Sequence, residues 1–338
     1  MKYKDQFSKD PSIYLLVKEN KGGLYPSLFA QFIGLCLVLF LSFTAFSCQK
    51  ESEKVIEEKK LKVVTSLFPL YDFAKNIGGQ KADVTLLLPP GVEPHSFEPR
   101  PGDVLKLHDA DIFIYTGRDM EPWVEDILKS LGSQGPLIVN ASKHIAFIEE
   151  DFEKEHKSEP WKRDPHIWLD FSNAQKMVDN ILEGFEDKDP KYNDYFIKKA
   201  RGYQTRLTEL DRKFSDSLSS CKKDTLIHGG HSVFGYLARR YNIKYLPAYS
   251  GFSPDMEPTP KNLIELSKKL REYDIKYIFY EELIQPRVSE AIARETKANL
   301  LMLHGAHNIT KEEFDRGITF LDLMEKNLEN LKIGLECR

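Results

Sequence analysis

The chain has 338 residues, of which 41% are apolar and 30% are charged. This length is enough for two packed domains of typical size and argues against a single small module. The formal charge is −4, with Lys and Arg interspersed among acidic residues. A nucleic-acid-binding protein needs a basic stripe to displace counterions, so this class of function is excluded.

Residues 1–48 are predicted to be a signal peptide with a lipobox-like end. Basic residues precede the apolar stretch FIGLCLVLFLSFTAF at 32–46, which is short for a bilayer span and typical of a signal-peptide core. The core ends at Ser47-Cys48, and a small residue before cysteine resembles a bacterial lipoprotein signal, in which the cysteine becomes lipidated. An uncleaved N-terminal anchor is the alternative, and both interpretations predict an exported protein anchored to the membrane.

After a charged linker at 49–60, the chain alternates between predicted strands and helices. Short apolar and β-branched runs, separated by helix-length segments, predict strands at 61–66, 83–88, 111–117, 136–140, 224–230, 243–248, 275–281 and 299–305. This alternation predicts an α/β fold of two lobes, at 61–189 and 221–338, each with a mostly parallel sheet flanked by helices.

The segment at 190–220 is predicted to be one long, rigid α-helix that joins the lobes. Its apolar residues recur at steps of three, four or seven, as expected of an amphipathic helix: Tyr192, Phe196, Tyr203, Leu207, Leu210, Phe214 and Leu218. Asp189-Pro190 is a typical helix start. A helix of about thirty residues is roughly 45 Å long, so we expect a stiff connection with little hinge bending.

The cysteines leave one pairing open. Cys36 lies inside the signal core and Cys48 at its end, so only Cys221 and Cys337 belong to the folded part. An extracytoplasmic compartment permits disulfides, but the sequence does not show whether these two residues meet. Their spacing is not that of a cysteine metal site.

Four histidines lie where a predicted strand ends and a loop begins: His95 in VEPHSFEP, His166 in DPHIWLD, His231 in HGGHSVFG and His307 in LHGAHNIT. Prolines restrict the backbone of the first two loops and so fix the direction of the imidazole. The carboxyl ends of parallel strands form the edge at which α/β units bind ligands. We therefore expect the four side chains, two from each lobe, to converge in the cleft between the lobes.

Four imidazoles can complete the tetrahedral shell of a Zn²⁺ ion. The sequence contains no HExxH helix, GxSxG elbow or glycine-rich phosphate loop. A catalytic zinc site keeps one position open for water, so four candidate ligands favour metal binding over catalysis. A zinc hydrolase with Glu93 or Glu281 as its base is the enzymatic alternative.

Several motifs together resemble a known family: PPGVEPHSFEP, DPHIWLD, HSVFGYLARRY, GFSPDMEPTPKNL, YIFYEE and LMEKNLENLK. They are similar to the zinc and manganese solute-binding proteins of cluster A-I (cluster 9) metal ABC importers, most of all to the zinc-specific branch. The resemblance runs from about residue 60 to 333. It implies a non-enzymatic, monomeric lipoprotein or periplasmic receptor that delivers one transition-metal ion to an ABC permease and its ATPase.

The resemblance also implies the ligand set. The family's metal ligands fall on His95, His166 and His231, and the fourth position, usually Glu or Asp, falls on His307. This change replaces a carboxylate by a neutral imidazole, which suits Zn²⁺ better than Mn²⁺ because Mn²⁺ prefers oxygen ligands. Zn²⁺ is thus the implied cargo. A water in place of His307, a manganese receptor and an additional adhesin role are the alternatives.

The other histidines have weaker assignments. His304 is expected either to orient a ligand or to pack at a strand end, and His228 is expected at the end of a buried strand. His108 and His144 are interpreted as surface or packing residues. His156 lies in an acidic segment at the place where zinc-specific relatives often carry a histidine-rich loop.

Overall fold

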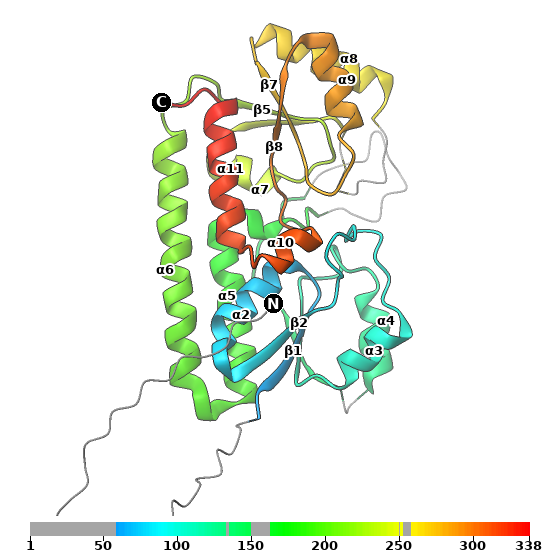
Figure 1. Ribbon diagram of the computed structural model, residues 1–338, viewed down its shortest axis with the longest axis vertical. Helices are drawn as coiled ribbons and strands as arrows, with labels where there is room; N and C mark the ends of the chain where they lie inside the picture. The colour runs from blue at the N-terminus through cyan, green and yellow to red at the C-terminus, as the bar shows by residue number, and fades with distance from the viewer. Residues whose placement is uncertain (1–58, 133–134, 150–162, 250, 253–257) are drawn as a thin grey trace, which may run out of the picture. The chain divides into compact units, whose positions relative to one another are not determined.

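The computed structural model (Figure 1) describes residues 59–132, 135–149, 163–249, 251–252 and 258–338. All of them belong to one compact unit that runs from Glu58 to Arg338. The predicted signal peptide with Cys36 and Cys48, the linker up to residue 58, and His156 lie outside the described residues. Among the described residues, no helix has the length and apolar character needed to cross a membrane.

The first sheet has four parallel strands in the order β2-β1-β3-β4. They are β1 (Leu61–Thr65), β2 (Ala82–Leu86), β3 (Ile112–Tyr115) and β4 (Leu137–Asn140). The helices of this lobe are α2 (Phe68–Gly78), α3 (Pro101–His108), α4 (Val124–Leu131) and α5 (Phe171–Lys188). Central strand β3 is buried on both faces, which explains why its sequence IFIY is continuously apolar.

The second sheet repeats this arrangement with the order β6-β5-β7-β8, again all parallel. Its strands are β5 (Thr225–His228), β6 (Lys244–Pro247), β7 (Tyr277–Tyr280) and β8 (Asn299–Met302). Its helices are α7 (Gly235–Arg240), α8 (Pro260–Glu272), α9 (Arg287–Thr296), α10 (Lys311–Asp315) and α11 (Phe320–Gly334). The predicted fold class, two α/β lobes with parallel sheets, is confirmed.

The predicted long helix is α6, which spans Asn193–Leu218 and is preceded by a 3-10 turn at Pro190–Tyr192. Its buried face includes five of the residues that define the predicted apolar stripe: Phe196, Tyr203, Leu207, Leu210 and Phe214. The helix lies alongside α2, α5 and α11 (Figure 1). It is therefore packed against helices that precede it and follow it in the chain. We keep as a proposal the predicted division into a first lobe at 61–189, a linking helix at 190–220 and a second lobe at 221–338.

One hydrophobic core extends through both lobes. It includes Phe73 of α2, Trp168 near α5, Phe214 of α6 and Phe320 of α11. The rings of Phe73 and Phe320 meet edge to face with their centroids 5.2 Å apart. Because this core is shared, the lobes are held together by apolar packing as well as by the chain that connects them.

The two cysteines of the folded part are joined. Cys221, just after α6, forms a disulfide with Cys337, just after α11. The same two residues also form an isolated antiparallel bridge. The pairing that the sequence left open is thus present, and it connects the ends of two helices that pack side by side.

Candidate metal centre

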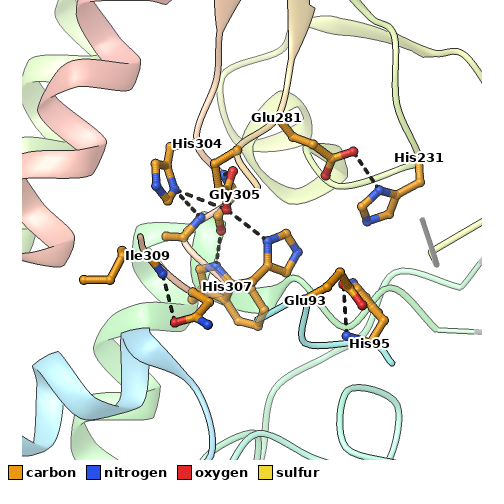
Figure 2. A network of polar contacts seen from close by, with 12 residues as sticks. Glu93, His95, His231, Glu281, His304, Gly305, His307 and Ile309 are labelled. Carbon is orange, nitrogen blue, oxygen red and sulfur yellow. Dashed lines mark hydrogen bonds and ion pairs between the residues drawn. The ribbon is translucent and has the colours of Figure 1, made fainter. Parts of the chain in front are cut away.

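The four predicted histidines lie together in the structure. One ring nitrogen from each of His95, His166, His231 and His307 falls within 4.8 Å of the other three. They come from the loops after β2, β4, β5 and β8, so each sheet contributes two from the carboxyl ends of its strands. Figure 2 shows the polar contacts around three of them. The expected convergence of loops from both lobes is therefore seen.

The loop that carries His95 is shaped by its own sequence. Gly91 has a φ of 84°, a conformation that residues with a Cβ rarely adopt. The Glu93 carboxylate accepts hydrogen bonds from the backbone N–H groups of His95, at 3.0 Å, and Ser96, at 2.8 Å. This turn presents the imidazole of His95 to the other three histidines.

His166 is completely buried and held by the residue two positions before it. Its Nδ1 lies 2.7 Å from Oδ1 of Asp164, which also accepts the backbone N–H of His166 at 3.0 Å. The adjacent Trp168 donates from its indole nitrogen to the carbonyl of Gly305 at 2.7 Å. The DPHIWLD motif thus orients a histidine and also contacts the loop that carries His307.

His231 is oriented from a neighbouring strand. Its Nδ1 lies 3.0 Å from Oε1 of Glu281, which directly follows β7, the neighbour of β5. Both side chains are buried, and Figure 2 shows this pair. Glu281, considered from the sequence as a catalytic base, is instead paired with Nδ1 of His231.

His307 is oriented by Glu282, a residue that the sequence did not single out. Its Nδ1 lies 3.3 Å from Oε1 of Glu282, while Oε2 accepts the backbone N–H of Gly305 at 2.6 Å. His304 Nδ1 lies 3.2 Å from the same carboxylate (Figure 2). One buried carboxylate therefore fixes the whole turn from His304 to His307.

Three of the four histidines have buried ring nitrogens without a hydrogen-bond partner among the described residues. Within the described part of the chain, Nε2 of His166, Nε2 of His307 and both ring nitrogens of His95 are buried and unpaired. Leaving a buried polar atom unpaired costs about 1–3 kcal/mol. With Nδ1 fixed by a carboxylate, Nε2 of His166 and His307 is left to bind a cation.

Burial also sets the protonation states. It lowers the pKa of His95 and of His166 well below 6.5, and the neighbouring histidines lower it further. Neutral imidazole is the form that binds metal. Burial raises the pKa of Glu281 to about 7. Burial also raises the pKa of Glu282, but His304 and His307 outweigh it and hold that pKa well below 4.5.

Comparison with known proteins identifies the family. Residues 63–334 match the family model described as "ZnuA: Zinc-uptake complex component A periplasmic". The chain belongs to this family. It is 35% identical over 318 residues to the high-affinity zinc uptake system protein ZnuA of Bacillus subtilis (strain 168), covering 91% of this chain and 99% of that protein.

Solved structures of the family have the same fold. The Zn(II)-bound ZnuA-like domain of Streptococcus pneumoniae AdcA has a TM-score of 0.71 at 31% identity, covering 82% of this chain and all of that domain. The laminin-binding protein Lmb of Streptococcus agalactiae, titled a bifunctional protein with adhesin and metal transporting activity, has a TM-score of 0.72 at 29% identity, covering 82% and 100%. The chain spans only 60% of the length of the zinc-binding lipoprotein AdcA of Streptococcus pneumoniae (strain ATCC BAA-255 / R6).

Outside this cluster, the remaining described histidines lie as expected. His228 is buried at the end of β5, and His108 and His144 are exposed. His304 is buried beside Glu282, so it packs at a strand end and also contacts the carboxylate that orients His307. Sequence reasoning missed Asp164 and Glu282 as partners of His166 and His307. Both stood beside signals that it used, because Asp164 lies two residues before His166 and Glu282 directly follows the predicted strand at 275–281.

Proposed function

We propose that this chain is the extracytoplasmic zinc-binding component of an ABC importer for metals, capturing Zn²⁺ with His95, His166, His231 and His307. The observation that carries the proposal is the convergence of four histidine nitrogens within 4.8 Å from loops of both sheets. In a tetrahedral zinc site with bonds of about 2.0–2.1 Å, the nitrogens lie about 3.4 Å apart. Small movements of the rings toward the ion are enough to complete such a shell.

The ligand chemistry supports zinc over manganese. All four candidate ligands are imidazoles, and Asp164, Glu281 and Glu282 lie one step further out, each at the Nδ1 of a histidine. Imidazole suits Zn²⁺, Cu²⁺ and Ni²⁺, whereas Mn²⁺ prefers oxygen. The names of the zinc-binding relatives agree with this preference.

A binding role also accounts for the acidic residues better than hydrolysis does. The Glu93 carboxylate accepts backbone N–H groups of its own loop, and Glu281 is paired with His231. A hydrolase would need one of them as a base beside an open metal position. In the proposed site, four histidines fill the four coordination positions of the zinc ion, so no position is left for a reacting water. The protein is therefore proposed to hold the ion and to pass it unchanged to a permease and its ATPase.

The proposed location is outside the cytoplasm, as a monomer held to a membrane by a lipid on Cys48. Support comes from the lipobox-like sequence and from the pneumococcal relative that is named a lipoprotein. Mass spectrometry of the mature protein should find a modified Cys48 at its N-terminus, and Cys48→Ser should release the protein from membranes. An unmodified Cys48, or a membrane-bound variant, would contradict the anchor.

Elemental analysis tests the metal site directly. Protein purified without added metal should contain about one zinc per chain, the stoichiometry of a single tetrahedral site. His166→Ala should lose most of this zinc, while His144→Ala, at an exposed histidine, is the matched control and should retain it. A cell that lacks the protein should grow poorly under zinc limitation and recover with the wild-type chain but not with His166→Ala.

An adhesin role is a second candidate, favoured by the likeness to the laminin-binding protein Lmb. It is compatible with zinc binding because the metal site is buried and an adhesive surface is not. Immobilised laminin should then retain the purified protein, with His166→Ala retained equally well. Absence of retention would remove this candidate and leave the importer role untouched.

A further inference from the structure

Two stretches of backbone meet beside the metal site, and a single side chain joins them. Asn308, directly after His307, is fully buried. Its Nδ2 donates to the carbonyl of Pro89 at 2.7 Å and to the carbonyl of Val92 at 2.9 Å. Val92 lies three residues before His95. The amide therefore connects the loop of the fourth histidine, from the second lobe, to the loop of the first, from the first lobe.

Other contacts fix the direction of this amide. Oδ1 of Asn308 accepts the backbone N–H of Ile309 at 2.9 Å (Figure 2). The backbone N–H of Gly91 in turn donates to the carbonyl of Ile309 at 2.8 Å. An asparagine amide has two N–H donors on one nitrogen, and both of them are used. Reversing the amide would place its oxygen against two carbonyl oxygens, so the orientation is determined.

We propose that Asn308 is a positioning residue that sets His95 relative to His307 before a metal ion binds. This inference rests on the proposed function and deepens it. Three hydrogen bonds hold residues 89–92 against residues 308–309, and none of them involves the metal ligands themselves. His95 is therefore held in place by a contact between the lobes as well as by its own loop.

Positioning of this kind acts on affinity through preorganisation. Ordering one residue costs about 1–2 kcal/mol of backbone entropy, and a loop that is already ordered does not incur this loss when the ligand arrives. Groups that orient metal ligands typically change metal affinity about 10–100-fold. We expect Asn308→Ala to weaken zinc binding within this range, mainly by faster dissociation.

The chain contains a matched control. Asn180 on α5 is also a buried asparagine whose Nδ2 donates to two backbone carbonyls, those of Ala141 at 2.8 Å and Lys143 at 2.9 Å. Its contacts lie within the first lobe and do not touch the loops of His95 or His307. Asn180→Ala therefore removes the same kind of double hydrogen bond without touching the contact between the His95 and His307 loops. Its acceptors lie at the start of the segment that leads from β4 to His166, so it should lower stability with a much smaller loss of zinc affinity than Asn308→Ala.

The experiment measures zinc dissociation constants by chelator competition for the full folded chain, in the wild type, Asn308→Ala and Asn180→Ala. Asn308→Ala is then repeated in a His95→Ala background. Because Asn308 is proposed to act through His95, it should cause no further loss there. An equal loss in both backgrounds, or wild-type affinity for Asn308→Ala, would overturn the proposal.

A second measurement needs no variant. In metal-free wild-type protein, the amide of Gly91 should exchange with deuterium slowly, because it is bonded to Ile309 without help from zinc. Exchange as fast as an exposed amide would overturn the inference even if Asn308→Ala failed to fold. Failure of the wild type to bind zinc would refute the proposed function, whereas normal zinc binding with a rapidly exchanging Gly91 would refute only this inference.

Discussion

Glu282 has two roles at the proposed site: it supplies negative charge, and it orients His307. Its carboxylate contacts His304, His307 and the backbone of Gly305 while being buried itself. A shell of four neutral imidazoles leaves the two charges of a zinc ion uncompensated, which is unfavourable in a buried site. Glu282 supplies negative charge one step from the proposed ligand, and it also orients His307.

Replacing Glu282 by Gln removes this charge and keeps the size of the side chain. We expect zinc affinity to fall about 10–100-fold, the range for partners that orient metal ligands. The control is Glu121→Gln, because Glu121 is also buried and accepts the backbone N–H groups of Thr116 and Gly117 without touching a histidine. Calorimetric titration of both variants checks the prediction, and equal losses would count against it.

His307 is the residue at which metal preference should change. His307→Ala leaves three histidines, so zinc should bind more weakly with water in the gap. His307→Asp restores a charged oxygen ligand and should recover much of the affinity while reducing the preference for zinc over manganese. Competition binding of Zn²⁺ and Mn²⁺ measures this, and a His307→Ala protein with wild-type affinity and selectivity would remove His307 from the ligand set.

Asp72 should make stability depend on pH away from the metal site. Burial raises its pKa to about 6, opposed by the hydrogen bond from Tyr203. Because the folded state holds the proton more tightly than the unfolded state, the free energy of unfolding should decline as pH rises from about 4 to about 6. Asp72→Asn should remove the part of this decline that Asp72 contributes and leave the part from Glu281, whose pKa is also raised by burial. Denaturant titrations of metal-free protein across this range test it, and an unchanged slope in the variant would contradict the assignment.

Among the elements, the strands followed directly from the sequence. The runs VVT of β1 and IFI of β3 are buried at every position because central parallel strands are covered on both faces, and both strands lie where they were predicted. The α-helix α6 begins three residues later than predicted, because Pro190–Tyr192 form a 3-10 turn first. The spacing of apolar residues was sufficient to predict these elements because each of them buries residues at regular intervals.

The contacts within the site could not be predicted in the same way. Four histidines at strand ends indicated a metal site, because strand ends of parallel sheets share an edge. Glu282 and Asn308 act through contacts with loops that are distant in sequence, and a single sequence contains no record of those contacts. The Cys221–Cys337 pair was open for the same reason. Asp164 is different, because it lies only two residues before its partner His166.

The disulfide between the ends of α6 and α11 should contribute to stability. It closes a segment of 116 residues, and removing a native disulfide typically costs about 2–5 kcal/mol. The double variant Cys221→Ser/Cys337→Ser should therefore unfold at lower denaturant concentration, and reducing agent should destabilise the wild type but not the variant. Equal midpoints for oxidised and reduced wild type would show that the bond adds nothing.

At the scale of the whole molecule, zinc should stabilise the fold without a large change in shape. Binding to the folded state alone adds about 2.7 kcal/mol when free zinc is a hundred times its dissociation constant. The shared core and the packing of α6 against α2, α5 and α11 oppose a hinge motion. Melting temperature should rise with zinc while the radius of gyration from small-angle scattering stays nearly constant. A marked compaction would show that the lobes close on the metal.

The disulfide also closes the stretch of chain that contains all four strands of the second sheet into a covalent ring. His231 and His307 both lie between Cys221 and Cys337, so a single cut of the backbone anywhere in this interval leaves them on one covalently connected molecule. A protein nicked there would separate into two pieces only under reducing conditions. After such a cut, the bond thus keeps the second pair of proposed zinc ligands on one molecule.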